Sequence, residues 1–220
     1  MTKLMDSMDG ATPRRGFFAR MAGAVTLGLA GLSASPLRAQ TTGAASSGPD
    51  WPGALKGQYK QVVDAYDVNA GFPLAFVYTF LATNEPSNST GVLVLRHGAF
   101  PLSLNDAMWQ KYKIGESLAI NDPETKAVAT KNPYYKPKSG VLPSDDIALD
   151  RLIEKGTVVG ACNFALRFFA KKLSGNAGMT PEETAKEFAA NLVPGLTVIP
   201  SGTWGVNRAQ NAGCTYCAGG

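Results

Sequence analysis

The chain of 220 residues contains a single histidine, His97. Most catalytic zinc and non-haem iron sites use several histidine ligands, so one histidine excludes a site of that class. The segment Cys214-Thr-Tyr-Cys217 also lacks the following histidine that covalent haem attachment requires. We therefore predict neither a metal nor another cofactor.

The sequence has no apolar run long enough to span a bilayer. Its longest N-terminal run, Met21–Ala34, has 14 residues diluted by glycine, against the about 20 that a membrane helix needs. Arg14-Arg15 and Phe17-Phe18 before it look like a twin-arginine export signal, and Leu37-Arg38-Ala39 offers a cleavage site. We predict that residues 1–39 are a signal peptide, that the protein is periplasmic, and that it has no stable membrane anchor.

The mature chain has almost no excess charge of either sign. Removing residues 1–39 lowers Lys+Arg from 21 to 16 and Asp+Glu from 17 to 15. A basic patch for nucleic acid is therefore not expected. Residues 40–57, rich in small and polar side chains, predict a flexible leader.

Cysteine is also scarce, with three residues, and an odd number leaves at least one thiol without a partner in the chain. Cys214 and Cys217 form a CxxC pair, which in an oxidising compartment can be a redox pair or a structural disulfide. Thioredoxin-type pairs start a helix after a strand, whereas this pair lies near position 220, which favours the structural alternative.

The third cysteine, Cys162, lies where a strand pattern changes to a helix pattern. Thr157–Ala161 is a short apolar run, and the residues after Cys162 repeat with helical spacing. We expect Phe164, Phe168, Leu166 and Ala170 on the apolar side of this helix. A helix N-terminus supplies free N–H groups and positive dipole, which favour thiolate over thiol. The alternative is that Cys162 is a small buried apolar side chain.

Strand and helix patterns alternate over residues 58–220. We predict a single three-layer α/β domain with a mainly parallel sheet, interrupted by a loop-rich insert at about 113–145. The expected strands are Gln58–Tyr66, Thr90–Arg96, Thr157–Ala161 and Leu196–Pro200. The expected helices are Gly71–Ala82, Ser103–Tyr112 capped by Ser103, a helix capped by Asp145 or Asp146 and ending at Glu154, one after Cys162, one beginning at Thr180-Pro181, and a short one after Thr203.

Three of these strands end in small or polar residues, and the carboxyl ends of parallel strands lie at one edge of a sheet. We therefore expect a pocket there. Cys162 and His97 are its candidate catalytic residues, although His97 could instead fix the strand end by hydrogen bonding. Backbone and side-chain groups at five further positions could bind a small anion: Arg96, Gly98, Asn163, Ser201 and Gly202.

Four segments carry a family resemblance: Val94–Gly98, Trp109–Tyr112, Gly160–Asn163 and 193–213. In this order and spacing they resemble the DsrE/DsrF-like family in its exported branch, over roughly residues 58–216. The resemblance implies a small parallel-sheet fold that assembles into dimers, trimers or hexamers. In the sulfur-relay members of that family, a cysteine matching Cys162 accepts sulfur as a persulfide from a donor protein. The insert departs from the compact relay proteins.

Two functions follow from these observations. In the first, Cys162 is a persulfide carrier that exchanges sulfur with a donor or acceptor protein, and His97 accepts its proton. In the second, the protein is a non-catalytic homo-oligomer that binds a small ligand or assembles through the same region. The sequence leaves open whether the chain is an enzyme.

Overall fold

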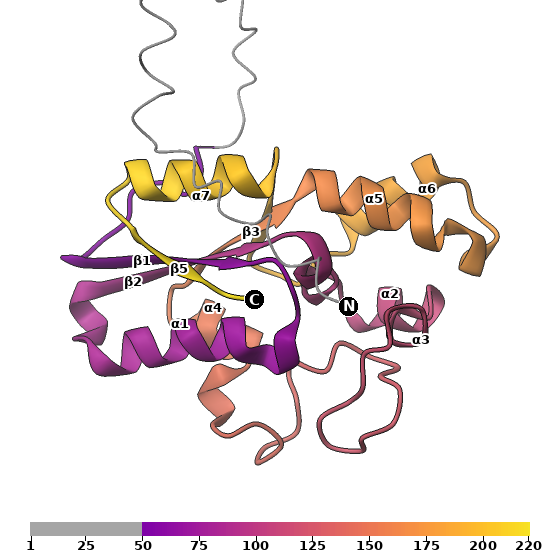
Figure 1. The fold of residues 1–220 in the computed structure, drawn as a ribbon, viewed down its shortest axis with the longest axis horizontal. Coiled ribbons are helices and arrows are strands. Elements are labelled where there is room, and N and C mark those ends of the chain that lie inside the picture. Colours follow the sequence, from indigo (N-terminus) through magenta and orange to yellow (C-terminus); the bar gives the residue numbers. More distant parts are fainter. Residues whose placement is uncertain (1–49) are drawn as a thin grey trace, which may run out of the picture. The chain divides into compact units, whose positions relative to one another are not determined.

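A computed structural model describes residues 50–220 and contains one five-stranded sheet. The strands are β1 (Tyr59–Ala65), β2 (Ser89–Leu95), β3 (Val158–Cys162), β4 (Leu196–Ile199) and β5 (Thr215–Ala218). All neighbouring pairs are parallel, in the order β4-β3-β2-β1-β5. The predicted α/β fold with a parallel sheet is therefore confirmed (Figure 1).

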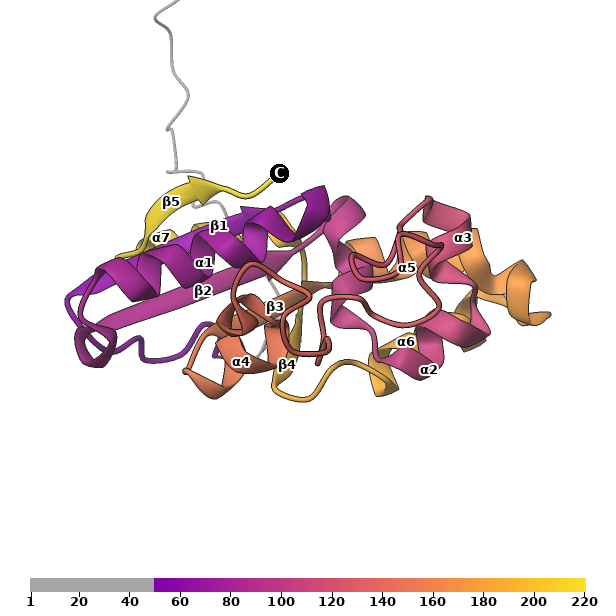
Figure 2. The same cartoon turned by 90° about the horizontal axis from the view of Figure 1, so that it is seen from below.

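Helices cover both faces of the sheet (Figures 1 and 2). On one side α7 (Gly202–Asn211) packs on β1, β2 and β3, and on the other α1 (Phe72–Thr83) packs on β1 and β2. Alternate residues of β2 point to the two sides, with Val92 and Val94 in one core cluster and Leu93 and Leu95 in the other. Burial on both faces explains why this strand is apolar throughout.

The remaining helices are α2 (Asp106–Lys111), α3 (Ile114–Leu118), α4 (Leu149–Glu154), α5 (Asn163–Leu173) and α6 (Pro181–Ala190). Helix α6 begins as its sequence predicts. The Thr180 hydroxyl accepts a hydrogen bond from the N–H of Glu183, and the Glu183 carboxylate accepts one from the N–H of Thr180, which is a capping box. Helices α5 and α6 pack beside each other at one end of the sheet (Figure 1).

Two predicted helix caps are wrong. Residues His97–Ser103 form a short 3-10 helix, so α2 begins later and its cap is Asn105, whose side chain accepts from the N–H of Met108. Helix α4 has no side-chain cap, because Asp145 belongs to a separate 3-10 turn capped by Ser144. In both places an intervening turn displaces the start of the helix.

The sequence interpretation missed β5. This strand is only four residues long and pairs with β1 at the edge of the sheet. Its register places Cys217 beside Val63. Leu196–Ile199 is therefore not the last strand.

The second half of the expected leader is not free of the domain. Trp51 is 6% exposed and packs against the Trp204 ring of α7, with ring centroids 6.2 Å apart. The Thr90 hydroxyl also donates to the carbonyl of Lys56. Residues 1–49, which include the predicted signal peptide, lie outside the described residues.

The insert packs on the domain instead of extending from it. Asn132 is buried, and its side-chain amide donates to the carbonyls of Leu102 and Leu104. Tyr134 is also buried and lies against Gly71 at the start of α1. These contacts hold residues 132–134 of the insert against the domain. Within residues 50–220, no helix has the length and apolarity to cross a membrane.

Candidate functional site

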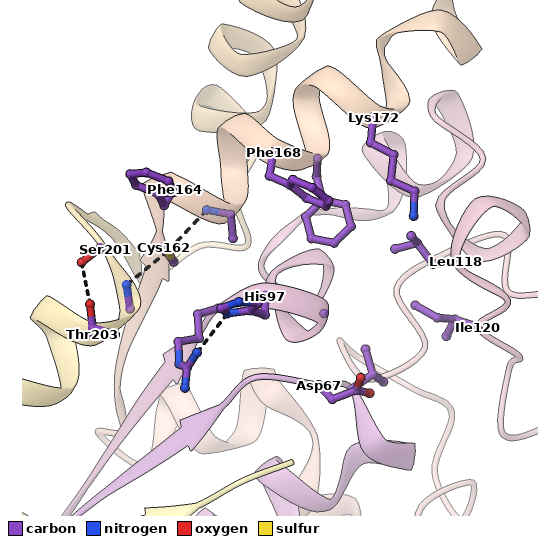
Figure 3. A pocket seen from close by; sticks show the side chains of 16 residues that line it. Asp67, His97, Leu118, Ile120, Cys162, Phe164, Phe168, Lys172, Ser201 and Thr203 are labelled. Carbon is purple, nitrogen blue, oxygen red and sulfur yellow. Dashed lines mark hydrogen bonds between the residues drawn. The ribbon is translucent and has the colours of Figure 1, made fainter.

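The ends of β2, β3 and β4 meet at one cavity of about 740 Å³ (Figure 3). Arg96 and His97 follow β2, Cys162 ends β3, and Ser201 to Thr203 follow β4. The parallel sheet brings these segments together because all its strands end at the same edge. The structure thus joins residues that are separated by more than 100 positions in the sequence.

Cys162 lies where two helices begin. It is the N-cap of α5, and its Sγ accepts a hydrogen bond from the N–H of Ala165 at 3.4 Å. Its Sγ also accepts one from the N–H of Gly202, the first residue of α7, at 3.2 Å. Two backbone N–H donors, one from the first turn of each helix, therefore converge on this sulfur. The sequence indicated both helices, but not that the N–H of Gly202 at the start of the second one meets Cys162.

Cys162 is nevertheless 4% exposed. Cys162 is one of the residues that line the cavity. Its low exposure leaves the cavity as the route by which a small reagent would approach this residue.

Arg96 is held beside this cysteine by a buried carboxylate. Its Nε donates to Oδ1 of Asp64 at 2.6 Å and its Nη2 donates to Oδ2 at 2.9 Å. The hydrogen bond to Asp64 is the main cause that raises the pKa of Arg96, and the negative charge available to Cys162 adds to it. The guanidinium also lies 5.4 Å from the centre of the Tyr66 ring. Arg96 is thus a fixed positive charge near Cys162.

His97 is exposed and interacts with Arg96. Its Nδ1 accepts a hydrogen bond from Nη1 of Arg96 at 2.9 Å, because a guanidinium can only donate. No hydrogen bond joins His97 to Cys162 in the described part of the chain. The backbone of His97 has φ of 45°, an uncommon left-handed conformation for a side chain of this kind. This geometry matches the alternative in which His97 fixes the strand end.

The predicted anion-binding residues separate into two groups. Gly98, Ser201 and Gly202 line the cavity, but Asn163 is not among its lining residues. The Ser201 hydroxyl accepts from the N–H of Trp204 at 3.1 Å and so caps α7. Gly202 contributes its N–H to Cys162 instead of to a free anion.

The apolar wall of the cavity was missed. Phe164 and Phe168, expected on the packed side of α5, are 78% and 62% exposed and line the cavity. The packed side consists of other residues of the same helix: Ala165, Leu166, Phe169, Ala170 and Leu173. Leu118 and Ile120 of the insert also line the cavity, which no sequence pattern indicated.

Cys214 and Cys217 lie away from this cavity and on opposite sides of the sheet. Cys214 belongs to the core cluster beneath α7, and Cys217 packs against the other cluster. Both are free thiols, so the structure does not contain the disulfide considered from the CxxC spacing. Burial raises the pKa of Cys214 to about 11 and also raises the pKa of Cys217. Both shifts oppose a thiolate.

No known protein-family profile and no curated protein matches this sequence. A search of solved structures finds a protein of unknown function, MTH1491 from Methanobacterium thermoautotrophicum. It shares 16% identity, with a TM-score of 0.41 over 73% of this chain and 99% of that one. Within residues 50–220, no group of three or more His, Cys, Asp or Glu side chains could hold a metal ion.

Proposed function

We propose that the protein is a sulfur carrier in which Cys162 receives a sulfur atom as a persulfide and passes it to an acceptor. The observation that supports this most is the position of Sγ between the N–H groups of Ala165 and Gly202. Those donors stabilise a thiolate on Sγ before Cys162 takes up sulfur and again when an acceptor removes the outer sulfur.

The transfer itself needs no oxidant. The Cys162 thiolate attacks the outer sulfur of a donor persulfide, and a new S–S bond forms. The donor S–S bond breaks, and its inner sulfur leaves as a thiolate that takes a proton from water. Arg96 lies beside the reacting sulfur and offsets its negative charge.

The resemblance to the exported DsrE/DsrF-like proteins supports the same role. In this proposal the twin-arginine-like segment directs the protein to the periplasm, and the domain forms a homo-oligomer. A sulfur donor or acceptor protein would meet it there. His97 then acts through Arg96, which it contacts, and not as the proton acceptor.

One observation favours the second candidate, a ligand-binding module without chemistry. Cys162 is almost fully buried, and its two hydrogen bonds would equally hold a structural thiol at the base of a binding cavity. The two candidates differ in whether this sulfur reacts in the folded state.

Sulfur uptake by the folded protein decides between them. We expect the wild type, reduced and then incubated with inorganic polysulfide, to gain one sulfur atom by intact-protein mass spectrometry, localised to Cys162 by peptide mapping. The Cys214→Ser/Cys217→Ser double variant should gain it equally, and Cys162→Ser should not. Uptake on Cys214 or Cys217 alone, or uptake by Cys162 only after denaturation, would contradict the carrier function.

A further inference from the structure

The cavity above Cys162 continues along α5 as a stripe of three side chains. Phe164, Phe168 and Lys172 are four residues apart, so they lie on one side of the helix. All three line the cavity (Figure 3). At 1.5 Å per residue the stripe is about 12 Å long. It runs from the sulfur of Cys162, past the two phenylalanine rings, to the positive charge of Lys172.

The apolar part of this stripe packs on buried rings and shares the cavity with a second apolar surface. The ring of Phe168 meets the ring of Phe169 edge-on at 5.3 Å, and Phe169 stacks on buried Phe100 at 5.9 Å. Leu118 and Ile120 line the same cavity from the insert. The volume of about 740 Å³ falls in the range of about 300–1,000 Å³ that small-molecule sites occupy.

The charges of the cavity orient a ligand. The guanidinium of Arg96, near the sulfur, already donates hydrogen bonds to Asp64 and His97. Asp67, the carboxylate that lines the cavity, accepts a hydrogen bond from the N–H of Asn69 at 3.0 Å. Lys172 takes part in no ion pair among those of residues 50–220. The cation left for a ligand is therefore at the far end of the stripe.

We propose that the sulfur donor or acceptor of Cys162 is a small organic thiol or persulfide with an apolar body and a distal carboxylate. Its sulfur lies against Cys162, its body lies between Phe168 and the insert side chains, and its carboxylate meets Lys172. The ligand class is argued from the cavity, whereas the transfer step rests on the proposed function. That step is the balanced exchange given above. When Cys162 attacks an organic persulfide, the organic thiolate leaves, and when an organic thiolate attacks the outer sulfur of the Cys162 persulfide, the Cys162 thiolate leaves.

Binding is measured without transfer in the Cys162→Ser variant. Calorimetry under reducing conditions compares 8-mercaptooctanoic acid with 8-mercapto-1-octanol, which differ only in the terminal anion. We expect the acid to bind about threefold more tightly, which is the size of effect of one exposed charge pair. Lys172→Met should abolish this preference, and Lys171→Met, on the same helix outside the cavity lining, should keep it.

The apolar wall is tested in the same way. Phe168→Ala should weaken both compounds about tenfold, whereas Phe72→Ala, which removes an exposed ring from α1, should not. Absence of binding at millimolar concentration, or an unchanged affinity in Phe168→Ala, would overturn the proposal. The proposal would also be overturned if light scattering showed that Phe168→Ala converts an oligomer to monomers. In that case a second copy of the chain, and not a small ligand, would occupy the stripe.

The two proposals fail separately. If Cys162 takes up polysulfide sulfur but the mercapto acid does not bind, the carrier function stands and the ligand class is wrong. If the mercapto acid binds with the expected variant pattern but Cys162 takes up no sulfur, the ligand class stands and the transfer step is wrong.

Discussion

The backbone N–H of Gly202 donates a hydrogen bond to Sγ of Cys162 at 3.2 Å, across 40 positions of sequence. The glycine is required there for a steric reason, since a Cβ at position 202 would collide with the side-chain stem of Arg96. The same residue thus brings the start of α7 close to both the candidate nucleophile and its neighbouring cation.

Gly202→Ala should therefore lower the reactivity of Cys162. The added methyl group has to displace Arg96 or α7, and either movement weakens the N–H to Sγ contact. We expect alkylation of Cys162 by iodoacetamide at pH 7 to slow about tenfold, about the effect of losing one hydrogen bond to a charged group. Gly205→Ala, in the same helix, is the control, because a Cβ there would meet Ile199 and Trp51 and not the site. Equal slowing in both variants would mean that general loosening of α7, and not the contact at Cys162, controls the rate.

Asp64→Asn should destabilise the fold and release Arg96. Asp64 is buried and also accepts a hydrogen bond from the Tyr216 hydroxyl at 3.1 Å. Its negative charge is therefore paired with Arg96 where water has limited access. We expect the free energy of unfolding in urea to fall by about 2 kcal/mol, less than for a fully buried pair because Arg96 keeps some exposure. Glu154→Gln breaks the exposed pair with Arg151 and should leave stability unchanged within error. If Asp64→Asn lost no more unfolding free energy than Glu154→Gln, the structural role of Asp64 would be contradicted.

Stability should decrease in alkali in a way that depends on Cys214. Burial raises the pKa of its thiol from 9.0 to about 11, so the folded state keeps a proton that the unfolded state loses first. The stabilisation from this thiol is complete below about pH 9 and is lost as pH rises through 11. The fall in urea midpoint between pH 8.5 and 10.5 should accordingly be smaller in Cys214→Ala than in the wild type. Equal pH dependence in the two proteins would show that Cys214 is not buried.

Trp51→Ala should cost about 3 kcal/mol of unfolding free energy, as for other large core side chains. The indole fills space between Trp204, Gly160 and Gly205, so its removal leaves a cavity in this core cluster. The control is Tyr59→Ala, which truncates a half-exposed ring. Thermal and urea unfolding compare the stability of the two variants. If both variants were equally stable, the segment before β1 would be a leader, as the sequence suggested.

Apart from α3 and β5, the order of strands and helices was predictable from the sequence because the signals for it are local. The apolar run ending at Leu95 indicates a strand buried on both faces, and Thr180-Pro181 indicates the start of a helix. Neither signal depends on the rest of the structure. The position of Cys162 between a strand and a helix is a local property of the same kind. The general rule for parallel sheets then brought the three strand ends together.

The tertiary structure alone decided which atoms meet at that edge. Periodicity placed Phe164 and Phe168 on the apolar side of α5, but contacts with Phe100 and α6 fixed the orientation of this helix, and the insert supplied the opposite wall. The partner of Arg96 is Asp64, 32 positions earlier, and the second donor to Cys162 is Gly202, 40 positions later. Such pairings depend on packing over long sequence separations, for which no local pattern of residues provides a signal.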